Sequence, residues 1–534
     1  MQDTYDIIVI GGGSAGCVIA NRLSEQTECR VLLLEAGRSD KHLFTRIPAA
    51  SPLAVSSPNF NWLYETQPDA SRNNLVDMWP AGRCLGGGSA INGMMFIRSH
   101  PWDFQHWHSL GNSGWDYDNV LLYFKRLENN ERGANSHRGA NGPQHVSEVR
   151  CSLPITDAWM QAAEQAGVPR SQDLNGENPD GVDYCQLSQQ NGLRQSTGHA
   201  YVWPVLKQRD NLTLKLNAEV SRIITENGRA TGVEYLQDGQ SQIVKANQGV
   251  VLSAGAIASP KILMLSGVGD AKQLQEKEIP VITDVPGVGK NLQEHPALNL
   301  ELRVNGRTLS SDQGFFRNIK HGLNFIFRRR GPLTTSIGHA QALVKTRPDL
   351  EAPNIQIILT PFSFEKTAEK IKISKEEAMG FAIGLMRPRS RGQILLASAK
   401  TADKPIIQHQ LLGNDEDIKE LIEGFRFSRK IVQQEVFKSY FVKEIFPGSA
   451  MDTDEEIETL ARNSAFPMYH PVGTCKMGND DMAVVDHKLK VKGMQNLWVA
   501  DASIMPTLTS GNTNATVIMI GEKASDLIKE HINN

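Results

Sequence analysis

The stretch Tyr5–Leu23, YDIIVIGGGSAGCVIANRL, decides the fold class of this chain. It opens with the apolar, largely β-branched run Ile7–Ile10, which is short enough to be a buried parallel strand. Gly11, Gly13 and Gly16 follow in the spacing G-x-G-x-x-G, and the residues after them have the composition of a helix. This order of strand, glycine turn and helix is typical of a Rossmann-like dinucleotide-binding unit.

Each glycine of this turn has a physical role. Gly11 permits the tight turn, Gly13 lets the backbone approach a pyrophosphate, and Gly16 lets the helix pack close to the strand. The N-terminus of the helix presents free N–H groups and a partial positive charge to the anion. We therefore expect Ser14 and Ala15 to face the pyrophosphate together with the three glycines.

A second strand is predicted from Arg30 to Leu34. It ends at Glu35, 19 residues after Gly16, and is followed by Ala36. A carboxylate at this position can accept hydrogen bonds from an adenosine ribose. Because strand, glycines, helix, strand and acid come in the expected order, a plain glycine turn is the less favoured alternative.

Length and composition restrict the class of protein. The chain has 534 residues, enough for three or four domains or for one composite enzyme of two domains. Its 40% hydrophobic and 22% charged residues are those of an ordinary globular protein, and a net charge of −3 gives no electrostatic footprint for nucleic acid. We find no run of about 18 apolar residues that could span a membrane. The first strand starts almost at Met1, so we expect no signal peptide.

The cysteines and one basic run bear on the location of the protein. The six cysteines are scattered without C-x-x-C spacing, which favours free thiols and a cytoplasmic protein. The run Arg328–Arg330 is expected to be a solvated surface, and no amphipathic membrane anchor is evident. Peripheral contact with a membrane remains open.

The remaining pattern predicts a discontinuous cofactor domain. A helix is expected at Arg194–Leu206, and a second strand–glycine–helix junction at Gly249–Leu265. Between about Leu300 and Met468 the sequence has no glycine-rich cofactor loop, and glycine- and asparagine-rich segments return after Met468. A helix is expected at Asp415–Val432. We predict an α/β protein, α+β overall, in which residues 1–150, 195–300 and 460–534 bind the cofactor. Residues 151–194 and 301–459 would form a substrate-binding domain on an antiparallel sheet with helices.

A second glycine-rich segment lies at Gly82–Asn92, GRCLGGGSAIN. Its three consecutive glycines imply unusual backbone or close approach to a flat ligand. A plain flexible loop is the alternative, which the apolar neighbours Leu85 and Ile91 disfavour.

These motifs together resemble those of the glucose–methanol–choline (GMC) flavin oxidoreductases over nearly the whole chain. The matching stretches are Gly82–Asn92, Gly255–Gly269, Gly287–Pro296, His470–Gly478, Val499–Ser503 and Gly511–Asn514. Ser99 stands where Gly, Ala or Pro is usual, and Glu294 stands in place of the usual Asp.

The resemblance implies FAD as the cofactor. Glu35 and Ala36 would then hold the adenosine, and Val220 would meet the adenine with its backbone. The other residues that the resemblance places along the cofactor are Gly86, Gly88, Ser89, Asn92, Gly93, Asp501, Ala502, Asn512 and Thr513. Some members attach FAD through a histidine immediately before the asparagine of the glycine-rich loop. That residue is Ile91 here, which implies non-covalent FAD.

Alcohol oxidation removes a hydroxyl proton and a hydride from one carbinol group. The flavin N5 accepts the hydride, so the protein must supply a base and a donor to the developing alkoxide. The resemblance assigns His470 as the base and Asn512 as its partner; Asn514 is the competing partner. Tyr469 and Trp62 are weaker candidates for lining the site.

The favoured function is oxidation of an uncharged primary alcohol to an aldehyde. His339 occupies the position where choline-active relatives often carry a glutamate, which removes a charge that favours a quaternary ammonium. Choline dehydrogenase and an oxygen-using oxidase remain alternatives, and the acceptor would be a quinone, another carrier or oxygen. A lyase acting on a cyanohydrin, a flavoprotein without turnover and a nicotinamide enzyme are further, less favoured readings.

Overall fold

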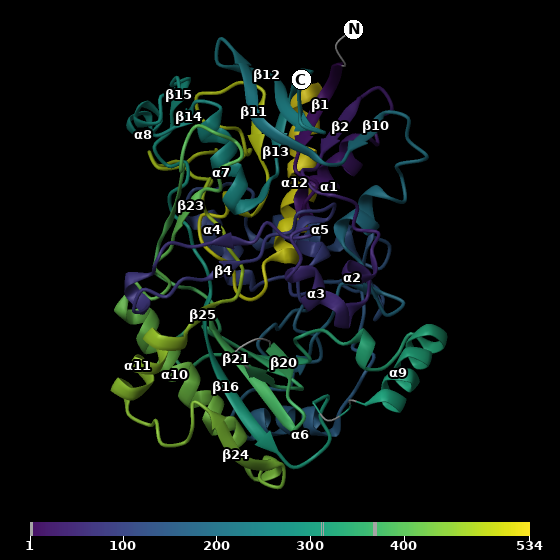
Figure 1. The fold of residues 1–534 in the computed structure, drawn as a ribbon, viewed down its shortest axis with the longest axis vertical. Helices are drawn as coiled ribbons and strands as arrows, with labels where there is room; N and C mark the ends of the chain where they lie inside the picture. Colours follow the sequence, from purple (N-terminus) through teal and green to yellow (C-terminus); the bar gives the residue numbers. More distant parts are fainter. Residues whose placement is uncertain (1–3, 311, 313, 367–370, 534) are drawn as a thin grey trace.

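The computed structural model describes residues 4–310, 312, 314–366 and 371–533. Two sheets organise it, one in the upper and one in the lower half of Figure 1. The first sheet contains β1 (Thr4–Ile10), β2 (Val31–Leu34), β10 (Leu212–Lys215), β11 (Ala218–Glu226), β12 (Arg229–Gln237), β13 (Gln240–Leu252) and β26 (Leu497–Val499). Its order is β10-β2-β1-β13-β12-β11, with β26 on β13. The neighbours β10–β2, β2–β1, β1–β13 and β13–β26 pair parallel, whereas β12 pairs antiparallel with both β13 and β11.

The half of the molecule that contains the first sheet is closed by segments from both ends of the chain. Helix α1 (Ser14–Leu23) follows β1 and packs against the C-terminal helix α12 (Asn514–Asn533), which runs through the middle of Figure 1. Gly521 allows the two helices to approach closely, because it has no Cβ. A Cβ at this position would lie 2.9 Å from the backbone oxygen of Ala15. Residues near position 514 are thereby brought to the glycine turn at the start of α1.

The second sheet is antiparallel throughout. It contains β7 (Gly181–Tyr184), β16 (Pro296–Val304), β17 (Ala340–Val344), β18 (Ile355–Thr360), β21 (Ala378–Leu385), β24 (Phe441–Phe446) and β25 (Phe466–Pro467). The order is β24-β16-β21-β18-β17-β7, with β25 on β16. Helices α6 (Pro154–Gln165) and α10 (Asp415–Val432) pack on one face, where alternate residues of β18 such as Ile355 and Ile357 are buried in the same core. The opposite face is left for the site.

The remaining elements are short or lie outside the two sheets. The other helices are α2 (Leu43–Arg46), α3 (Ser51–Val55), α4 (Pro101–Ser109), α5 (Tyr117–Leu127), α7 (Gly255–Leu265), α8 (Ala271–Glu276), α9 (Phe315–Arg328) and α11 (Asp454–Ser464). Two-stranded pairs are β3 (Tyr64–Glu65) with β4 (Met78–Trp79), β5 (Glu128–Asn130) with β6 (Gln144–Val146), β8 (Gln189–Gln190) with β9 (Leu193–Arg194), β14 (Val268–Gly269) with β15 (Thr283–Asp284), β19 (Phe364–Lys366) with β20 (Ile371–Ile373), and β22 (Gln393–Leu395) with β23 (Ile406–Gln408). Single turns lie at Pro48–Ala50 (η1), Ala70–Arg72 (η2), Gly87–Ala90 (η3), Gly198–Val202 (η4), Pro332–Thr334 (η5), Glu435–Phe437 (η6) and Ala502–Ile504 (η7).

The predicted fold class is confirmed, whereas one predicted helix is wrong. The segment Arg194–Leu206 is not a continuous helix, because only Gly198–Val202 forms a single π-helical turn. Arg194 belongs to β9, and its buried guanidinium donates a hydrogen bond to Asn92 Oδ1. Pro204, which has no N–H to continue a helix, follows the turn.

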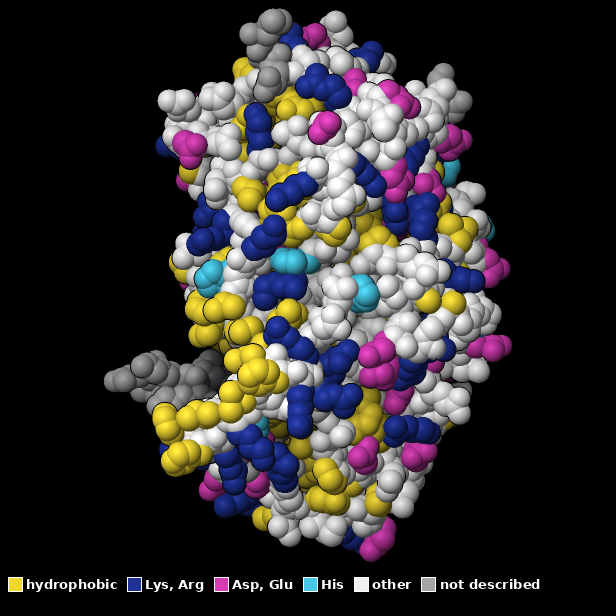
Figure 2. Space-filling view, turned by 90° about the vertical axis from the view of Figure 1, so that its right-hand side faces the viewer, with side chains coloured by type: hydrophobic (Ala, Val, Ile, Leu, Met, Phe, Trp, Pro, Cys, Tyr) yellow, Lys and Arg dark blue, Asp and Glu magenta, His cyan; other side chains and the backbone are white. Residues whose placement is uncertain are grey.

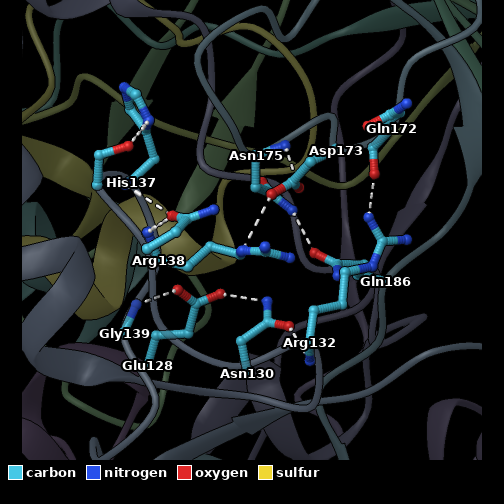
Figure 3. A network of polar contacts seen from close by, with 12 residues as sticks. Glu128, Asn130, Arg132, His137, Arg138, Gly139, Gln172, Asp173, Asn175 and Gln186 are labelled. Carbon is cyan, nitrogen blue, oxygen red and sulfur yellow. Dashed lines mark hydrogen bonds and ion pairs between the residues drawn. The ribbon is translucent and has the colours of Figure 1, made fainter.

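Two separate apolar cores accompany the two sheets, one around β1, β2 and β13 and the other around β16, β18 and β21. The predicted domain boundaries stay a prediction. A polar network crosses the boundary proposed near residue 150, as Figure 3 shows. Glu128 accepts hydrogen bonds from Asn130 at 2.8 Å and from the Gly139 N–H at 3.1 Å, and Arg138 pairs with Asp173 at 3.4 Å. Residues on the two sides of that boundary therefore form one polar cluster.

Candidate active site

The three glycines of the first turn differ in what surrounds them. A Cβ on Gly11, whose φ is +94°, would lie 2.6 Å from the Ser253 oxygen, and one on Gly16 would lie 1.9 Å from the Gly11 oxygen. A Cβ on Gly13 would meet only the Ser253 oxygen, at 3.7 Å. Gly11 and Gly16 are thus demanded by the fold itself. Gly13 leaves open space at the N-terminus of α1, where an anion is favoured.

Glu35 lies at the end of β2 and is fixed to this turn. Its Oε2 accepts a hydrogen bond from the Gly12 N–H at 2.9 Å, and its Oε1 accepts one from the Gly37 N–H at 2.7 Å. Burial raises the pKa of this carboxyl to about 7 against these two bonds, which lower it. The Ala218 N–H donates to the Glu35 carbonyl at 2.9 Å, so Val220 in β11 lies two residues from that contact. The predicted adenosine residues are therefore neighbours.

The glycine-rich loop lies directly on the first turn. The Gly86 N–H donates to the Gly12 oxygen at 2.6 Å, and a Cβ on Gly87 would lie 2.8 Å from the Gly13 Cα. A Cβ on Gly88 would meet no atom within 4 Å, so this backbone is open on one side. Ser89 Oγ accepts a hydrogen bond from the Thr197 N–H at 3.0 Å. The two glycine segments thus form one backbone-lined surface, which is what a flat dinucleotide cofactor requires.

Asn92 and Gly93 end this loop and are held from two sides. Asn92 Oδ1 accepts hydrogen bonds from Arg194 Nη1 at 2.7 Å and from the Met94 N–H at 2.9 Å. The Ser336 hydroxyl donates a hydrogen bond to the Gly93 carbonyl oxygen. Arg194 is fully buried, and sequence reasoning did not find it because its role depends on contacts with residues 102 positions away.

Asp501 and Ala502 follow β26, where the C-terminal segment meets the first sheet. The Asp501 carboxylate accepts hydrogen bonds from the Gly255 N–H at 2.8 Å, from Ser259 Oγ at 2.6 Å and from the Ser503 N–H at 2.7 Å. This carboxylate is therefore committed to the start of α7. Thr513, next to the site, is almost completely buried.

His470 and Asn512 meet, as the sequence predicts for the reacting pair. Asn512 Nδ2 lies 3.1 Å from His470 Nε2, and Asn512 Oδ1 accepts a hydrogen bond from Gln356 Nε2 at 3.2 Å. The competing residue, Asn514, donates instead to Ser14 Oγ at 2.8 Å, at the first helix. Asn512 therefore lies beside the histidine, and Asn514 ties the same segment to the glycine turn at the start of α1.

The other nitrogen of His470 contacts a second histidine that sequence reasoning left without a role. His470 Nδ1 lies 3.0 Å from His295 Nδ1, and His295 Nε2 lies 3.0 Å from the Met386 carbonyl oxygen. A carbonyl only accepts, so we assign the proton of neutral His295 to Nε2, which leaves its Nδ1 as an acceptor. His470 must then carry its proton on Nδ1, and its Nε2 lone pair faces Asn512.

The electrostatics keep both rings neutral. Burial lowers the pKa of His470 to about 4, and burial together with the neighbouring His470 lowers the pKa of His295 well below its usual value. Glu294 lies behind the pair and accepts the His470 N–H at 2.7 Å and the His295 N–H at 2.8 Å. Burial raises the pKa of Glu294 to about 8. His470 Nε2 is therefore an unprotonated acceptor at neutral pH.

The weaker candidates are placed less centrally. His339 is buried against α6, where its Nδ1 lies 2.9 Å from Thr156 Oγ1, and its ring also contacts Tyr184. The Trp62 ring lies under the Arg83 guanidinium, 4.6 Å from the ring centroid, and Tyr469 is exposed with a φ of +64°. All six cysteines are free, and no group of three or more potential metal ligands occurs in the described part of the chain.

Both the sequence and the fold of this chain are similar to those of known proteins. Two family models described as GMC oxidoreductase match residues 5–297 and 388–521. The mitochondrial choline dehydrogenase of Mus musculus is 41% identical over 99% of this chain and 90% of that protein. The "Alcohol dehydrogenase [acceptor]" of Pseudomonas putida is 38% identical over 99% of this chain and 96% of that protein. The crystal structure of pyridoxine 4-oxidase from Mesorbium loti superposes with a TM-score of 0.89 at 28% identity, covering 99% of this chain and 100% of that one.

Proposed function

The chain belongs to the GMC oxidoreductase family, and on that premise we propose that it oxidises an uncharged primary alcohol to an aldehyde with non-covalently bound FAD. Membership makes it an FAD-dependent oxidoreductase that acts on CH–OH groups. The observation that carries the proposal is the His470–Asn512 pair, in which a histidine lone pair and an amide donor lie 3.1 Å apart.

The pair supplies what the protein must contribute to alcohol oxidation. His470 Nε2 accepts the hydroxyl proton, because its other nitrogen already donates to His295. The Asn512 amide donates a hydrogen bond to the oxygen as negative charge develops there. Gln356 holds the amide oxygen of Asn512, so the NH₂ end is directed at the histidine. After proton transfer, the imidazolium charge is shared with His295, whose Nδ1 accepts from His470.

The backbone surface around Gly13 and Gly88 fits FAD, because neither glycine has a neighbour closer than 3.7 Å where a Cβ would point. When bound, FAD supplies the acceptor for the hydride. Gly11 to Gly16 would hold the pyrophosphate, Glu35 the ribose and Gly86 to Gly93 the ring system. Ile91 is a buried aliphatic residue at the position where some relatives carry an attaching histidine, which supports non-covalent binding.

The charge state around the pair supports a neutral substrate. Gln356 donates to Gln341 at 2.7 Å as well as to Asn512, so two amides occupy this face of the second sheet. The carboxyl group of Glu294 is engaged by backbone N–H groups behind the histidines. A buried quaternary ammonium needs a compensating negative charge, which these side chains do not provide. The ring of His339 packs against α6 and not against the His470–Asn512 pair.

Choline dehydrogenase is the second candidate, and the 41% identity to the mouse enzyme favours it. The names of the relatives also support an electron acceptor other than a nicotinamide, and we propose a quinone, another carrier or oxygen.

We place the enzyme in the cytoplasm, with contact to a membrane only at its periphery. Among the residues described, no helix is both long and apolar enough to cross a bilayer.

The experiment is a comparison of kcat/KM for choline with that for hexanol and benzyl alcohol, using an artificial electron acceptor with and without oxygen. We expect the neutral alcohols to be preferred. A wide preference for choline would overturn the substrate proposal and leave a choline dehydrogenase. Anaerobic mixing with the preferred alcohol should bleach the bound flavin, which neither a lyase nor a flavoprotein without turnover would do.

A further inference from the structure

Helix α9 (Phe315–Arg328) projects from the substrate-domain side of the molecule, at the right of Figure 1. It lies in the segment GFFRNIKHGLNFIFRRRG, residues 314–331. Of its residues only Phe325 is buried. The helix is attached at its C-terminal end, where the Arg329 guanidinium stacks over the Phe325 ring and the Gly331 N–H donates to the Arg150 oxygen at 3.2 Å.

The apolar side chains of α9 form one stripe, and this stripe faces solvent. Its members are Phe315, Phe316, Ile319, Leu323, Ile326 and Phe327. At 100° per residue they fall within a sector of about 120°. Phe316 is 83% exposed and Phe327 is 79% exposed, whereas Phe325, which lies outside this sector, makes the contact with the protein. An amphipathic helix in a globular protein normally turns its apolar stripe to the core, so the orientation of α9 is reversed.

The stripe is accompanied by positive charge. Between residues 314 and 331 the sequence has five Lys or Arg residues and no Asp or Glu, in a chain whose net charge is −3. They are Arg317, Lys320, Arg328, Arg329 and Arg330. Asp312, just before the helix, pairs with Arg307 at 2.9 Å and with His321 at 3.2 Å. Figure 2 faces this side and shows hydrophobic side chains gathered at the height of α9, with Lys and Arg side chains beside them.

We propose that α9 docks the enzyme on the surface of an anionic phospholipid bilayer. A helix with aromatic and aliphatic residues on one face and Lys and Arg on the other lies in the plane of the membrane interface, with its apolar face about 5–10 Å deep. The cations then meet the lipid phosphates. The sequence pattern showed no amphipathic helix here and predicted a solvated surface at Arg328–Arg330; in the structure Arg328 ends the exposed helix α9.

Charge distinguishes this partner from the two obvious competitors. A second copy packed through α9 about a two-fold axis would bring the same cationic segment against itself. A nucleic acid would pair with the cations but would leave the apolar stripe in water. An anionic bilayer satisfies both halves of the helix, because it offers negative headgroups and an apolar interior within one side-chain length.

The surface lies close to the proposed cofactor loop. After α9 the chain continues through η5 to Ser336, whose hydroxyl donates to the Gly93 carbonyl next to Asn92. On the other side η5 contacts η1, which lies between α2 and α3, and these helices carry the exposed residues Leu43 and Leu53. Docking would therefore set the membrane beside the segment that leads to the flavin, although the inference rests on α9 and is independent of the oxidation chemistry.

The test is co-sedimentation of the FAD-loaded enzyme with vesicles of phosphatidylcholine, alone or mixed with phosphatidylglycerol. We expect the enzyme to bind the mixed vesicles at least about tenfold more tightly than the neutral ones, with the difference reduced at high salt. The double variant Phe316→Ser/Phe327→Ser should abolish binding. The triple variant Lys320→Gln/Arg328→Gln/Arg330→Gln should remove the preference for phosphatidylglycerol.

The matched control is Val76→Ser/Met78→Ser, which removes two exposed apolar side chains near β4, away from α9. It should bind vesicles like the wild type, and all variants should keep their flavin content. The proposal is overturned if the wild type does not sediment with phosphatidylglycerol vesicles, or if the α9 variants bind as well as it does. A dimer that the Phe316→Ser/Phe327→Ser variant dissociates, without vesicle binding by the wild type, would also overturn it and identify a second copy as the partner.

Discussion

The Nδ1 atoms of His295 and His470 lie 3.0 Å apart, although 175 residues separate the two histidines in the sequence. Two ring nitrogens can form this hydrogen bond only if one carries a proton and the other does not. The Met386 carbonyl fixes the proton of His295 on its far nitrogen, and the chain of bonds therefore determines which nitrogen of His470 is free. In the proposed reaction His295 would be a positioning residue, because it acts through His470.

A pair of variants at His295 tests this role. His295→Leu removes the acceptor for the His470 Nδ1–H, and we expect flavin reduction by alcohol to slow by about a hundredfold, the cost of a misplaced reacting group. His295→Gln can offer an amide oxygen to the same proton and should retain most of the rate. Stopped-flow reduction of the two variants at equal flavin content makes the comparison. Equal rates for both would exclude a positioning role.

Replacing His470 itself should have the largest effect. His470→Ala should slow flavin reduction by about 100- to 10,000-fold, the usual contribution of a general base. Asn512→Ala should cost about a hundredfold, since it removes one donor to the developing alkoxide. Flavin content should stay near normal in both.

Asn514→Ala is the control for this comparison. The Asn514 amide donates a hydrogen bond to Ser14 at the start of α1, so the variant should weaken FAD retention and leave the reduction rate of loaded enzyme unchanged. Loss of reduction in Asn514→Ala alone would reverse the assignment.

The pH dependence follows from the lowered pKa of His470, about 4 in the folded protein. The proposed base is already neutral above this value, so flavin reduction should be constant from about pH 6 to 8 and fall only in more acidic buffer. Between pH 4 and the unfolded value of about 6.5, the unfolded chain binds more protons at this residue than the folded one. The contribution of His470 therefore makes the free energy of unfolding rise with pH across that window and fall on acidification.

Two measurements check the pH prediction. Anaerobic stopped-flow from pH 5 to 9 should show no inflection between 6 and 8, and an inflection there that His470→Gln removes would contradict the assignment. Thermal unfolding of wild type and His470→Gln between pH 4.5 and 7 should show a smaller pH dependence in the variant. Identical slopes would mean that His470 is not buried in its neutral form.

The sequence predicted elements that carry their own local signals. Helix α10 has the predicted bounds, because Asn414 caps it with a hydrogen bond to the Glu416 N–H and acidic residues fill its first turn. Contacts between distant segments have no local signal in the sequence. The stretch Gly287–Pro296, which contains His295, resembles the family, but it does not predict the contact of His295 with His470. Helix α9 was missed because Asn318, Gly322 and Asn324 are weak helix formers, which lowers the helix propensity of the segment.

The linkage of the cofactor can be measured directly. Ile91 is a buried aliphatic residue and offers no nucleophile to the flavin. Precipitation of the purified enzyme with acid should therefore leave all yellow colour in the supernatant. Flavin absorbance that stays with the washed pellet would show covalent attachment through another residue, and peptide mapping of the pellet would identify it.

Gly13 and Gly16 make opposite demands, and a matched pair of alanine variants separates them. A Cβ at position 16 would lie 1.9 Å from the Gly11 oxygen, so Gly16→Ala should prevent α1 from packing and give little folded protein. A Cβ at position 13 would meet no atom closer than 3.7 Å in the protein, so Gly13→Ala should fold with a near-normal circular dichroism spectrum. The same methyl group occupies space that the pyrophosphate needs, and FAD occupancy should fall sharply. Gly13→Val should enlarge that loss. Folded Gly13→Val with a full complement of FAD would place the pyrophosphate elsewhere.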